Sequence, residues 1–274
     1  MQMNIMNKLA TELKSTAPMP VLFVGHGSPM NAIEETPYSR EWTKLGENLP
    51  RPTAILCISA HWETNGTFVT AMDQPKTIHD FGGFPQALFE VQYPAKGATV
   101  MAEETRNLVK NTQIKSDFNW GLDHGCWSIL THLYPKADIP VFQLSLDYTK
   151  SAASHFELSK ELAFLRRKGV LIIGSGNIVH NLRTVDWRNP DNAFDWASEA
   201  NAKIKKLILS GDFDQLLNYK SLGKAIELAA PSPEHYLPLI YALGLKENTE
   251  EVTFFNDKIV MGSISMTSLL IHSA

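Results

Sequence analysis

The chain has 274 residues, a length that favours one large α/β or all-β domain over two domains of ordinary size. Hydrophobic residues make up 44% and charged residues 20%, a globular balance that excludes a disordered or fibrous chain. The 25 basic and 29 acidic side chains give a formal net charge of −4, so no global basic field indicates nucleic acid as a partner.

The first residues and the cysteines bear on where the protein works. Residues 1–19 lack the continuous apolar region of a signal peptide, and we expect them to form an N-terminal extension of a catalytic domain at 20–274. No apolar stretch in the chain approaches the roughly 18 residues that a membrane span needs. Cys57 and Cys126 cannot build a disulfide framework. Together these features predict a cytoplasmic protein with no membrane partner.

Short apolar runs alternate with longer helical patterns along the chain, which is typical of βαβ units in a single α/β domain. Apolar runs without alternation predict buried strands at 20–24, 54–60, 141–146 and 170–173. Weaker strand patterns lie at 67–72, 251–255 and 263–271. Helical spacing of apolar residues predicts helices at 99–110, 127–134, 151–168, 193–209 and 234–243. The basic residues 166–168 end one of these patterns and are predicted to be a solvated helix end.

Three of the nine histidines stand past predicted strand ends or in glycine-rich turns: His26 in GHGSP, His61 in SAHWE and His180 in GSGNIVHN. Histidine is the commonest metal ligand and titrates near neutrality. In an open α/β sheet, ligands bind outside the carboxyl ends of the strands, a position that would gather His26 and His61 in one crevice. One such histidine alone would more often be structural, but several in one chain favour a site.

Two further histidines lie in loops rich in aromatic residues, His79 in IHDFGGFP and His124 in LDHGCW. Their aromatic neighbours suit a planar ligand and an ordinary core equally well. Asp80 beside His79 is equally compatible with a turn, and Asp123 is a candidate to orient or charge His124.

His235 is predicted to begin a helix together with Glu234. Neighbouring helical residues point about 100° apart, so we expect one of the two, and not both, to bind an ion. The remaining histidines have unremarkable contexts and are predicted to be structural: His132, His155 and His272.

No other motif competes with the histidines. The chain has no G-x-S-x-G, Walker, H-E-x-x-H or C-x-x-C motif. The segment Gly174-Ser-Gly-Asn follows a predicted strand but lacks the G-x-G-x-x-G pattern of a dinucleotide site.

Six sequence blocks carry a resemblance to a known family: GHGSPMNAIE, SAHWET, TIHDFGGFPQALFE, LDHGCWSIL, GSGNIVHNLR and SPEHYLPLIYALG. They closely resemble the class III extradiol ring-cleaving dioxygenases, and within that group the DOPA 4,5-dioxygenase branch. The blocks occur in order from about residue 20 to the C-terminus, which is far more specific than any one of them. GHGS alone would be weak, because small tetrapyrrole metal chelatases also open with a strand followed by GHGS.

The resemblance implies a non-haem Fe(II) enzyme that opens a catechol ring beside its hydroxyls with O₂. For a DOPA-like substrate this is 4,5-cleavage to a muconic semialdehyde. It also implies one α/β domain with a central, mostly parallel (mixed) sheet flanked by helices. The expected partners are a small catechol and O₂, with no nucleic acid, and the chain is expected to be a monomer or small homo-oligomer.

The resemblance also assigns roles to residues. His26 and His61 are implied as metal ligands, and His235 completes the metal site, with Glu234 as the fallback. A site this rich in histidine would also accept Zn(II). His180 is implied as the acid/base, with His124 helping to bind or polarise the oxygen-derived ligand. The expected substrate-binding residues are His79, Phe81, Phe84 and Trp127.

Two alternatives stay open at the level of the sequence. One is a histidine-zinc enzyme or tetrapyrrole metal chelatase that shares only the GHGS strand end. The other is a catalytically silent module that binds metal and aromatic compounds without consuming oxygen.

Overall fold

The computed structural model describes residues 18–273, so most of the extension expected at 1–19 lies outside the described residues. The strands are β1 (Val21–Gly25), β2 (Ala54–Ser59), β3 (Glu63–Thr64), β4 (Thr67–Thr70), β5 (Ile114–Asp117), β6 (Val141–Gln143), β7 (Leu146–Asp147), β8 (Val170–Gly176), β9 (Glu250–Phe255), β10 (Ile259–Val260), β11 (Ile264–Ser265) and β12 (Ser268–Ser273).

The helices alternate with these strands over much of the chain. They are α2 (Pro37–Asn48), α3 (Gln86–Phe89), α4 (Thr99–Leu108), α5 (His124–Leu133), α6 (Ala152–Glu161), α7 (Ala163–Arg166), α8 (Asp195–Ser210), α9 (Phe213–Leu217), α10 (Lys224–Ala229) and α11 (Leu237–Gly244), with short 3₁₀ turns at Pro29–Ala32, Leu182–Thr184 and Tyr219–Ser221. Within residues 18–273, none of the helices combines the length and the apolar character needed to cross a membrane.

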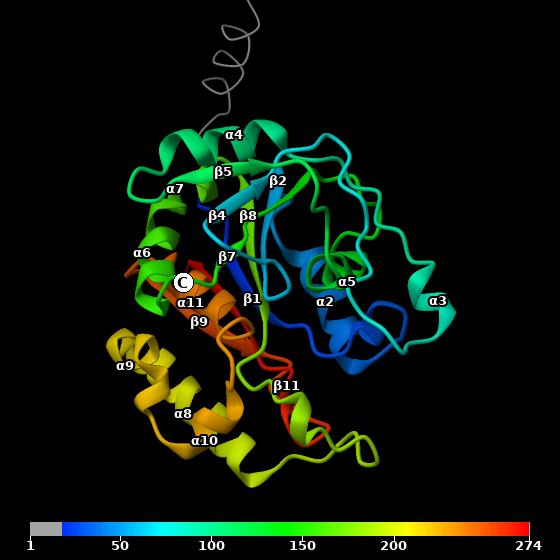
Figure 1. The fold of residues 1–274 in the computed structure, drawn as a ribbon, viewed down its shortest axis with the longest axis vertical. Coiled ribbons are helices and arrows are strands. Elements are labelled where there is room, and N and C mark those ends of the chain that lie inside the picture. The colour runs from blue at the N-terminus through cyan, green and yellow to red at the C-terminus, as the bar shows by residue number, and fades with distance from the viewer. Residues whose placement is uncertain (1–17, 274) are drawn as a thin grey trace, which may run out of the picture.

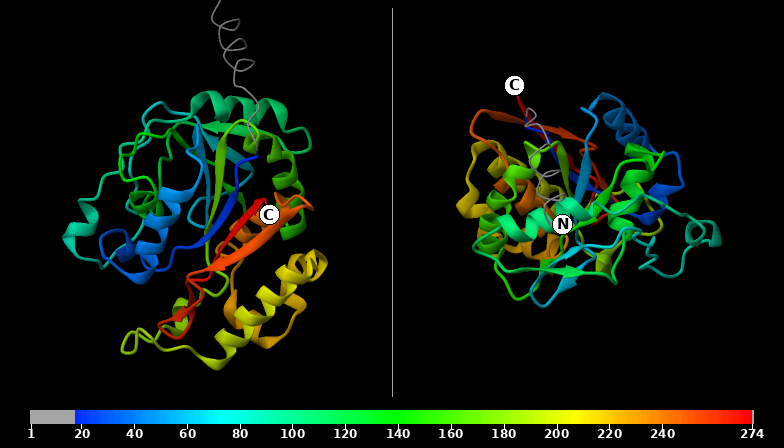
Figure 2. Two further views of the ribbon diagram at one scale, coloured as in Figure 1. Left: turned by 180° about the vertical axis from the view of Figure 1, so that it is seen from behind. Right: turned by 90° about the horizontal axis from the view of Figure 1, so that it is seen from above.

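A single α/β domain is built on a mixed central sheet, as predicted (Figure 1). Among the described residues the sheet has six strands in the order β6-β2-β8-β1-β12-β9. The first four are parallel to one another, and β12 runs antiparallel to both β1 and β9. Figure 2 shows β9 and β12 side by side at one end of the sheet.

The register brings the carboxyl ends of three parallel strands to one level. Gly25 of β1 pairs with Gly176 of β8, and Ser59 of β2 pairs with Ser175 of β8. Residues that follow these strands therefore leave the sheet at the same edge, where ligands bind in open α/β sheets.

Helices cover both faces of the sheet, which explains the continuous apolar strands. On one face Val24 belongs to the core cluster of Trp42 in α2 and Trp127 in α5. On the other face Phe23, the next residue along β1, packs in the cluster that contains Leu239 of α11. In Figure 1, α2 and α5 lie on one side of the central strands, and α6 and α11 on the other.

Three predicted elements are divided in the structure. The apolar run 141–146 ends in the central sheet after Gln143, and Leu146 then starts β7, which pairs with β3. The helical pattern 151–168 is broken at Leu162 between α6 and α7, and the strand pattern 263–271 separates into β11 and β12. Hydrophobicity reports burial in each case, but it does not report which partner the backbone pairs with.

Helix α2 was missed by apolar periodicity, although its start carries recognisable signals. The Thr36 side chain accepts a hydrogen bond from the Ser39 amide, and the Ser39 side chain bonds back to the Thr36 amide. This reciprocal capping box, followed by Pro37 in the first turn, is a sequence signature of a helix start.

The prediction of a solvated helix end at residues 166–168 is wrong for Arg166, whose side chain is fully buried. Its guanidinium forms an ion pair with Glu250 and donates hydrogen bonds of 2.7 Å to the carbonyls of Met19 and Leu245. These contacts join the segment before β1 to the segment before β9. A buried guanidinium needs such partners, because burying an unpaired charge is very costly.

Candidate metal centre

Five of the nine histidines converge at the carboxyl edge of the sheet. They are His26 just after β1, His61 just after β2, His124 at the start of α5, His180 after β8, and His235 in the turn before α11. The Nε2 atoms of His26 and His61 lie 3.2 Å apart. The ring of His235 lies 5.4 Å from that of His26 and 5.1 Å from that of His61, between ring centroids.

Glycines on both sides of His26 let the backbone turn tightly at the end of β1. Gly27 has a φ of +63°, a conformation that favours glycine. A Cβ at Gly25 would lie 2.8 Å from the backbone of Met266, closer than real contacts allow. The Asn31 side chain then holds the turn by donating a 3.0 Å hydrogen bond to the His26 carbonyl.

The tautomer of His26 follows from its partner, Ser175. The Ser175 hydroxyl donates its proton to the carbonyl of Gly125 at 2.6 Å. His26 Nδ1 lies 3.0 Å from the same hydroxyl oxygen, so this nitrogen must be the donor of that hydrogen bond. His26 therefore carries its proton on Nδ1, and its Nε2 presents a lone pair to His61.

Asp80 holds Nδ1 of two histidines. Its Oδ2 lies 3.3 Å from His61 Nδ1 and 3.0 Å from His124 Nδ1. Burial raises the pKa of Asp80, but the hydrogen bond from His124 and the charges of His124 and His61 outweigh it and lower the pKa overall. The negative charge of a carboxylate oxygen this close to both rings favours the tautomer with the proton on Nδ1, which leaves a lone pair on each Nε2.

His235 is held by its neighbour Glu234, which contradicts the expectation that the two would point apart on a helix. Helix α11 begins at Leu237, and both residues lie in the turn before it. His235 Nδ1 lies 3.2 Å from Glu234 Oε1, while His235 Nε2 is buried without a hydrogen-bond partner. Pro238 was the missed signal, because proline is tolerated in the first turn of a helix and not in its interior.

Gly176 and Asn177 at the end of β8 bring the His235 backbone to the site. A Cβ at Gly176 would lie 2.2 Å from the His235 carbonyl oxygen, so only glycine permits this approach. The Asn177 amide donates a 2.8 Å hydrogen bond to the same carbonyl.

Four imidazoles of the cluster, those of His26, His61, His180 and His235, have lowered pKa values, which favours the uncharged ring at neutral pH. Burial, followed by the charge of His61, lowers the pKa of His26 well below its ordinary value of 6.5. Burial and His180 do the same to the pKa of His235. Burial also lowers the pKa of His61 to about 3 and that of His180 to about 4. Neutral imidazole is the form that binds metal ions.

The donor set fits a metal ion. The Nε2 atoms of His26 and His61 lie 3.2 Å apart, and with both rings protonated on Nδ1 they present two lone pairs to the space between them. Two nitrogens that each lie about 2.1 Å from one ion are roughly 3.0 to 3.4 Å apart for angles of about 90° to 110°. The unpartnered Nε2 of buried His235 is a further nitrogen donor at this edge of the sheet. Among the described residues, His26, His61 and His124 form one metal-capable group, and His180, Glu234 and His235 form another.

Asp123 does not contact the His124 ring, although its place in the sequence made it a candidate to orient or charge that ring. Its buried carboxylate accepts hydrogen bonds from the Ser59 hydroxyl at 2.6 Å, the Gln143 amide group at 2.7 Å and the Cys126 amide at 3.1 Å. It thus caps α5 and joins that helix to the end of β2. The carboxylate that contacts the His124 ring is Asp80, which the sequence presented equally as a turn residue.

The aromatic residues expected to bind substrate form one cluster, but only part of it reaches the histidines. The Phe81 ring meets the His124 ring edge to face at 5.5 Å and the Phe84 ring at 5.4 Å. His79 Nε2 instead lies 3.0 Å from the Val91 carbonyl, and Trp127 Nε1 donates a 2.8 Å hydrogen bond to the Ile78 carbonyl. These two side chains hold the loop that carries Phe81.

The other three histidines have partners elsewhere in the fold. His132 contacts the Asn31 carbonyl, and His272 contacts Thr253 on the neighbouring strand. His155 Nδ1 lies 3.0 Å from the Tyr241 hydroxyl and Nε2 lies 3.2 Å from the Asp147 carbonyl.

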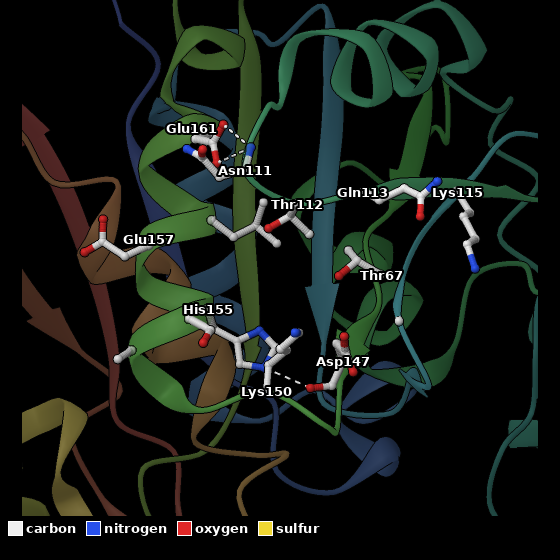
Figure 3. Close-up of a pocket in the computed structure, with 14 residues that line it drawn as sticks. Thr67, Asn111, Thr112, Gln113, Lys115, Asp147, Lys150, His155, Glu157 and Glu161 are labelled. Atoms are coloured by element: carbon white, nitrogen blue, oxygen red, sulfur yellow. Dashed lines mark hydrogen bonds between the residues drawn. The ribbon is translucent and has the colours of Figure 1, made fainter.

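His155 also lines a cavity of 580 Å³ beside α6, β4 and β5, which is separate from the five histidines (Figure 3). The Glu161 carboxylate in this cavity is occupied by the amides of Lys110 and Asn111. Both ring nitrogens of His155 are occupied as well. Because these polar groups are already satisfied, we place the candidate site at the histidine cluster and not in this cavity.

Comparison with known proteins adds to this geometry. Residues 20–268 match the family described as the catalytic LigB subunit of aromatic ring-opening dioxygenase. The chain is 48% identical over 263 residues to an Escherichia coli (strain K12) protein named 4,5-DOPA dioxygenase extradiol, covering 94% of this chain and 97% of that protein. A Beta vulgaris protein of the same name is 36% identical over 228 residues, covering 81% and 85%. A crystal structure of an uncharacterized protein from Escherichia coli K12 matches with a TM-score of 0.82 and 43% identity, covering 93% of this chain and all (100%) of that one.

Proposed function

The chain belongs to the LigB family of extradiol ring-opening dioxygenases, and we propose that it uses a bound ferrous ion and O₂ to open a catechol ring beside its hydroxyls. The proposed substrate is DOPA-like, and the proposed product of its 4,5-cleavage is a muconic semialdehyde. The names of the Escherichia coli and Beta vulgaris relatives support this substrate class. The family match over residues 20–268 favours this function over the tetrapyrrole chelatase.

One observation carries the proposal: three histidines turn Nδ1 outward to an acceptor and Nε2 inward. The acceptors are Ser175 for His26, Asp80 for His61 and Glu234 for His235. Metal-binding histidines in proteins almost always have such an outer partner, because it fixes the tautomer and orients the ring.

His26, His61 and His235 would therefore hold the metal through Nε2. When bound, ferrous iron supplies the redox chemistry with O₂ that amino-acid side chains lack. Zn(II) fits the same imidazoles but has no redox chemistry. The contact between Glu234 and His235 supports a role for Glu234 as the partner of a ligand, in preference to the fallback role as the ligand itself.

His180 is proposed to take a proton from a catechol hydroxyl and to return it later in the reaction. Burial lowers the pKa of His180 to about 4, so at neutral pH the ring is uncharged and able to accept a proton. His124 is proposed to bind or polarise oxygen, and the Asp80 carboxylate 3.0 Å from its Nδ1 would orient the ring for this role.

Phe81 and Phe84 are proposed to form the wall against which the planar substrate lies. Both rings are partly exposed, and Phe81 touches His124. The proposed contribution of His79 and Trp127 to substrate binding is to position this wall, because their polar atoms are bonded to backbone carbonyls.

The direct test is oxygen uptake by protein reconstituted anaerobically with ferrous iron. Admitting air with DOPA, protocatechuate or caffeate should consume O₂ and produce the strong colour of a muconic semialdehyde. The zinc-loaded protein is the matched control and should consume none. An absence of both colour and oxygen uptake across the panel, with iron confirmed bound, would overturn the proposal and leave the silent binding module.

Three further expectations belong with this proposal. They are a catalytic domain that begins near residue 20, a cytoplasmic location, and a monomer or small homo-oligomer. Each stays a prediction from the sequence.

A further inference from the structure

We propose that Asp80 is a positioning residue shared by two histidines, and that its single carboxylate fixes the tautomers of His61 and His124 together. The inference rests on the proposed function of the site, because it couples a proposed metal ligand to a proposed proton-handling group. The sequence offered Asp80 equally as a turn residue beside His79, and nothing in its local context pointed to this role.

The backbone delivers the Asp80 carboxylate to the two rings. The segment that carries Asp80 runs beside the segment that leads into α5, where the Ile78 amide donates to the Leu122 carbonyl at 2.7 Å and the Leu122 amide donates to the Lys76 carbonyl at 2.9 Å. Trp127 Nε1 adds a 2.8 Å hydrogen bond to the Ile78 carbonyl. These hydrogen bonds fix the segment just before Asp80 against the start of α5, and they thereby fix the position of Asp80.

Three nitrogen atoms approach the two oxygens of this carboxylate. Oδ1 accepts from the His124 backbone amide at 2.9 Å. Oδ2 lies 3.0 Å from His124 Nδ1 and 3.3 Å from His61 Nδ1. A carboxylate presents acceptor oxygens at both ends, so one oxygen accepts from the backbone amide while the charge of the other favours a proton on both Nδ1 atoms.

The shared oxygen also sets the relation between the two rings, whose centroids are 3.9 Å apart. If His61 took the other tautomer, an Nε2–H would point at His26 Nε2 and no lone pair would remain there for a metal. If His124 took it, Nε2 would become a donor instead of an acceptor. Asp80 disfavours both alternatives at once, because in either of them an Nδ1 lone pair would face a carboxylate oxygen.

Asp80→Asn is the sharpest test, because asparagine keeps the size of the side chain but has one acceptor oxygen. If the asparagine oxygen faces the two rings, its NH₂ group faces the His124 backbone N–H, and two donors oppose each other. If the asparagine is flipped, its NH₂ group faces the Nδ1 atoms of both rings instead. Asp73→Asn is the matched control, since it removes the same charge from the same connecting segment at an exposed position.

Two readouts apply to metal-free protein and do not depend on activity. Long-range proton–nitrogen NMR of ¹⁵N-labelled protein should show His61 and His124 as Nδ1–H tautomers in wild type and in Asp73→Asn. In Asp80→Asn both rings should show substantial Nε2–H character. Zinc affinity, measured by chelator competition, should fall about 10- to 100-fold in Asp80→Asn and stay unchanged in the control.

Unchanged tautomers for both histidines, with zinc affinity within about twofold of wild type, would overturn the proposal, as would a change confined to one ring. Should Asp80→Asn fail to fold by circular dichroism, Asp80→Glu decides the matter in the same way. It retains two acceptor oxygens but displaces them by one methylene, so the tautomers of both rings should shift, and a shift in neither ring or in only one would overturn the proposal. Failure of the dioxygenase proposal can be distinguished from failure of the Asp80 proposal. The former is measured by oxygen uptake of the wild-type ferrous protein, and the latter by the tautomers and zinc affinity of the variants.

Discussion

The rings of His180 and His235 lie flat against one another, with their centroids 3.4 Å apart and their planes 8° apart. This stacking places the proposed proton acceptor directly beside a proposed metal ligand without a hydrogen bond between them. Two neutral rings tolerate this arrangement, and burial keeps the pKa of both below the ordinary value. The two histidines can therefore have different functions at van der Waals distance.

Replacing His180 should separate catalysis from metal binding. We expect His180→Gln to retain stoichiometric metal, because three imidazoles remain, and to lower kcat by about 10²- to 10⁴-fold, the range of a lost general acid/base. Metal content and oxygen uptake on the same preparation check this. A metal-free His180→Gln protein would instead identify His180 as a ligand.

Replacing His61 should abolish metal binding and the stabilisation that accompanies it. A ligand that binds only the folded protein stabilises it by about 2.7 kcal/mol at a free concentration 100 times its Kd. Zinc should therefore raise the melting temperature of wild type and not that of His61→Ala. His272→Ala, at a half-buried position on β12 away from the other histidines, is the control and should respond like wild type. A full thermal shift in His61→Ala would exclude His61 as a ligand.

Replacing Glu234 and His235 separately should decide which of them completes the metal site. We expect Glu234→Gln to keep the metal with about tenfold weaker affinity, because glutamine still accepts from His235 Nδ1. His235→Ala should lose the metal. Metal content and the imidazole count from X-ray absorption test this pair, and the opposite pattern would make the carboxylate the ligand.

His155 should make stability depend on pH between about 6.5 and 4. Burial lowers the pKa of folded His155 to about 4, so the unfolded chain binds more protons in this window and protons favour unfolding. The contribution of His155 to the free energy of unfolding is fully present above pH 6.5 and is lost as the pH falls toward 4.

The wild type should therefore lose more stability than His155→Gln over this window, by an amount on the order of 3 kcal/mol at most. Urea unfolding of both metal-free proteins at pH 7 and pH 4.5 measures the stability that each loses between these two pH values. The other histidines contribute equally to both losses, so their contributions cancel when the two proteins are compared. Parallel pH profiles for the two proteins would show that His155 does not titrate in this way.

Local pattern in the sequence is enough to predict the central strands and the edge of the sheet that carries the site. The runs at 20–24, 54–60 and 170–173 are continuously apolar because β1, β2 and β8 are buried on both faces. The carboxyl ends of parallel strands meet at one edge, so His26 and His61 could be placed together. The run at 141–146 could not be divided correctly, because burial does not specify that Leu146 pairs with β3.

The tautomers and the ring orientations of the histidines could not be predicted from the sequence and became apparent only in the tertiary structure. Ser175, Asp80 and Glu234 determine which nitrogen of each histidine faces inward, and two of these partners reach their histidines from distant segments or loops. Arg166 is buried for the same kind of reason, since Glu250 lies 84 residues along the chain. Which histidines stand at strand ends could be predicted from the sequence, because a buried strand is a continuous apolar run of neighbouring residues. Only the folded chain decided how those histidines are oriented and protonated, because hydrogen bonds form between whatever groups the fold brings within 3 Å or so.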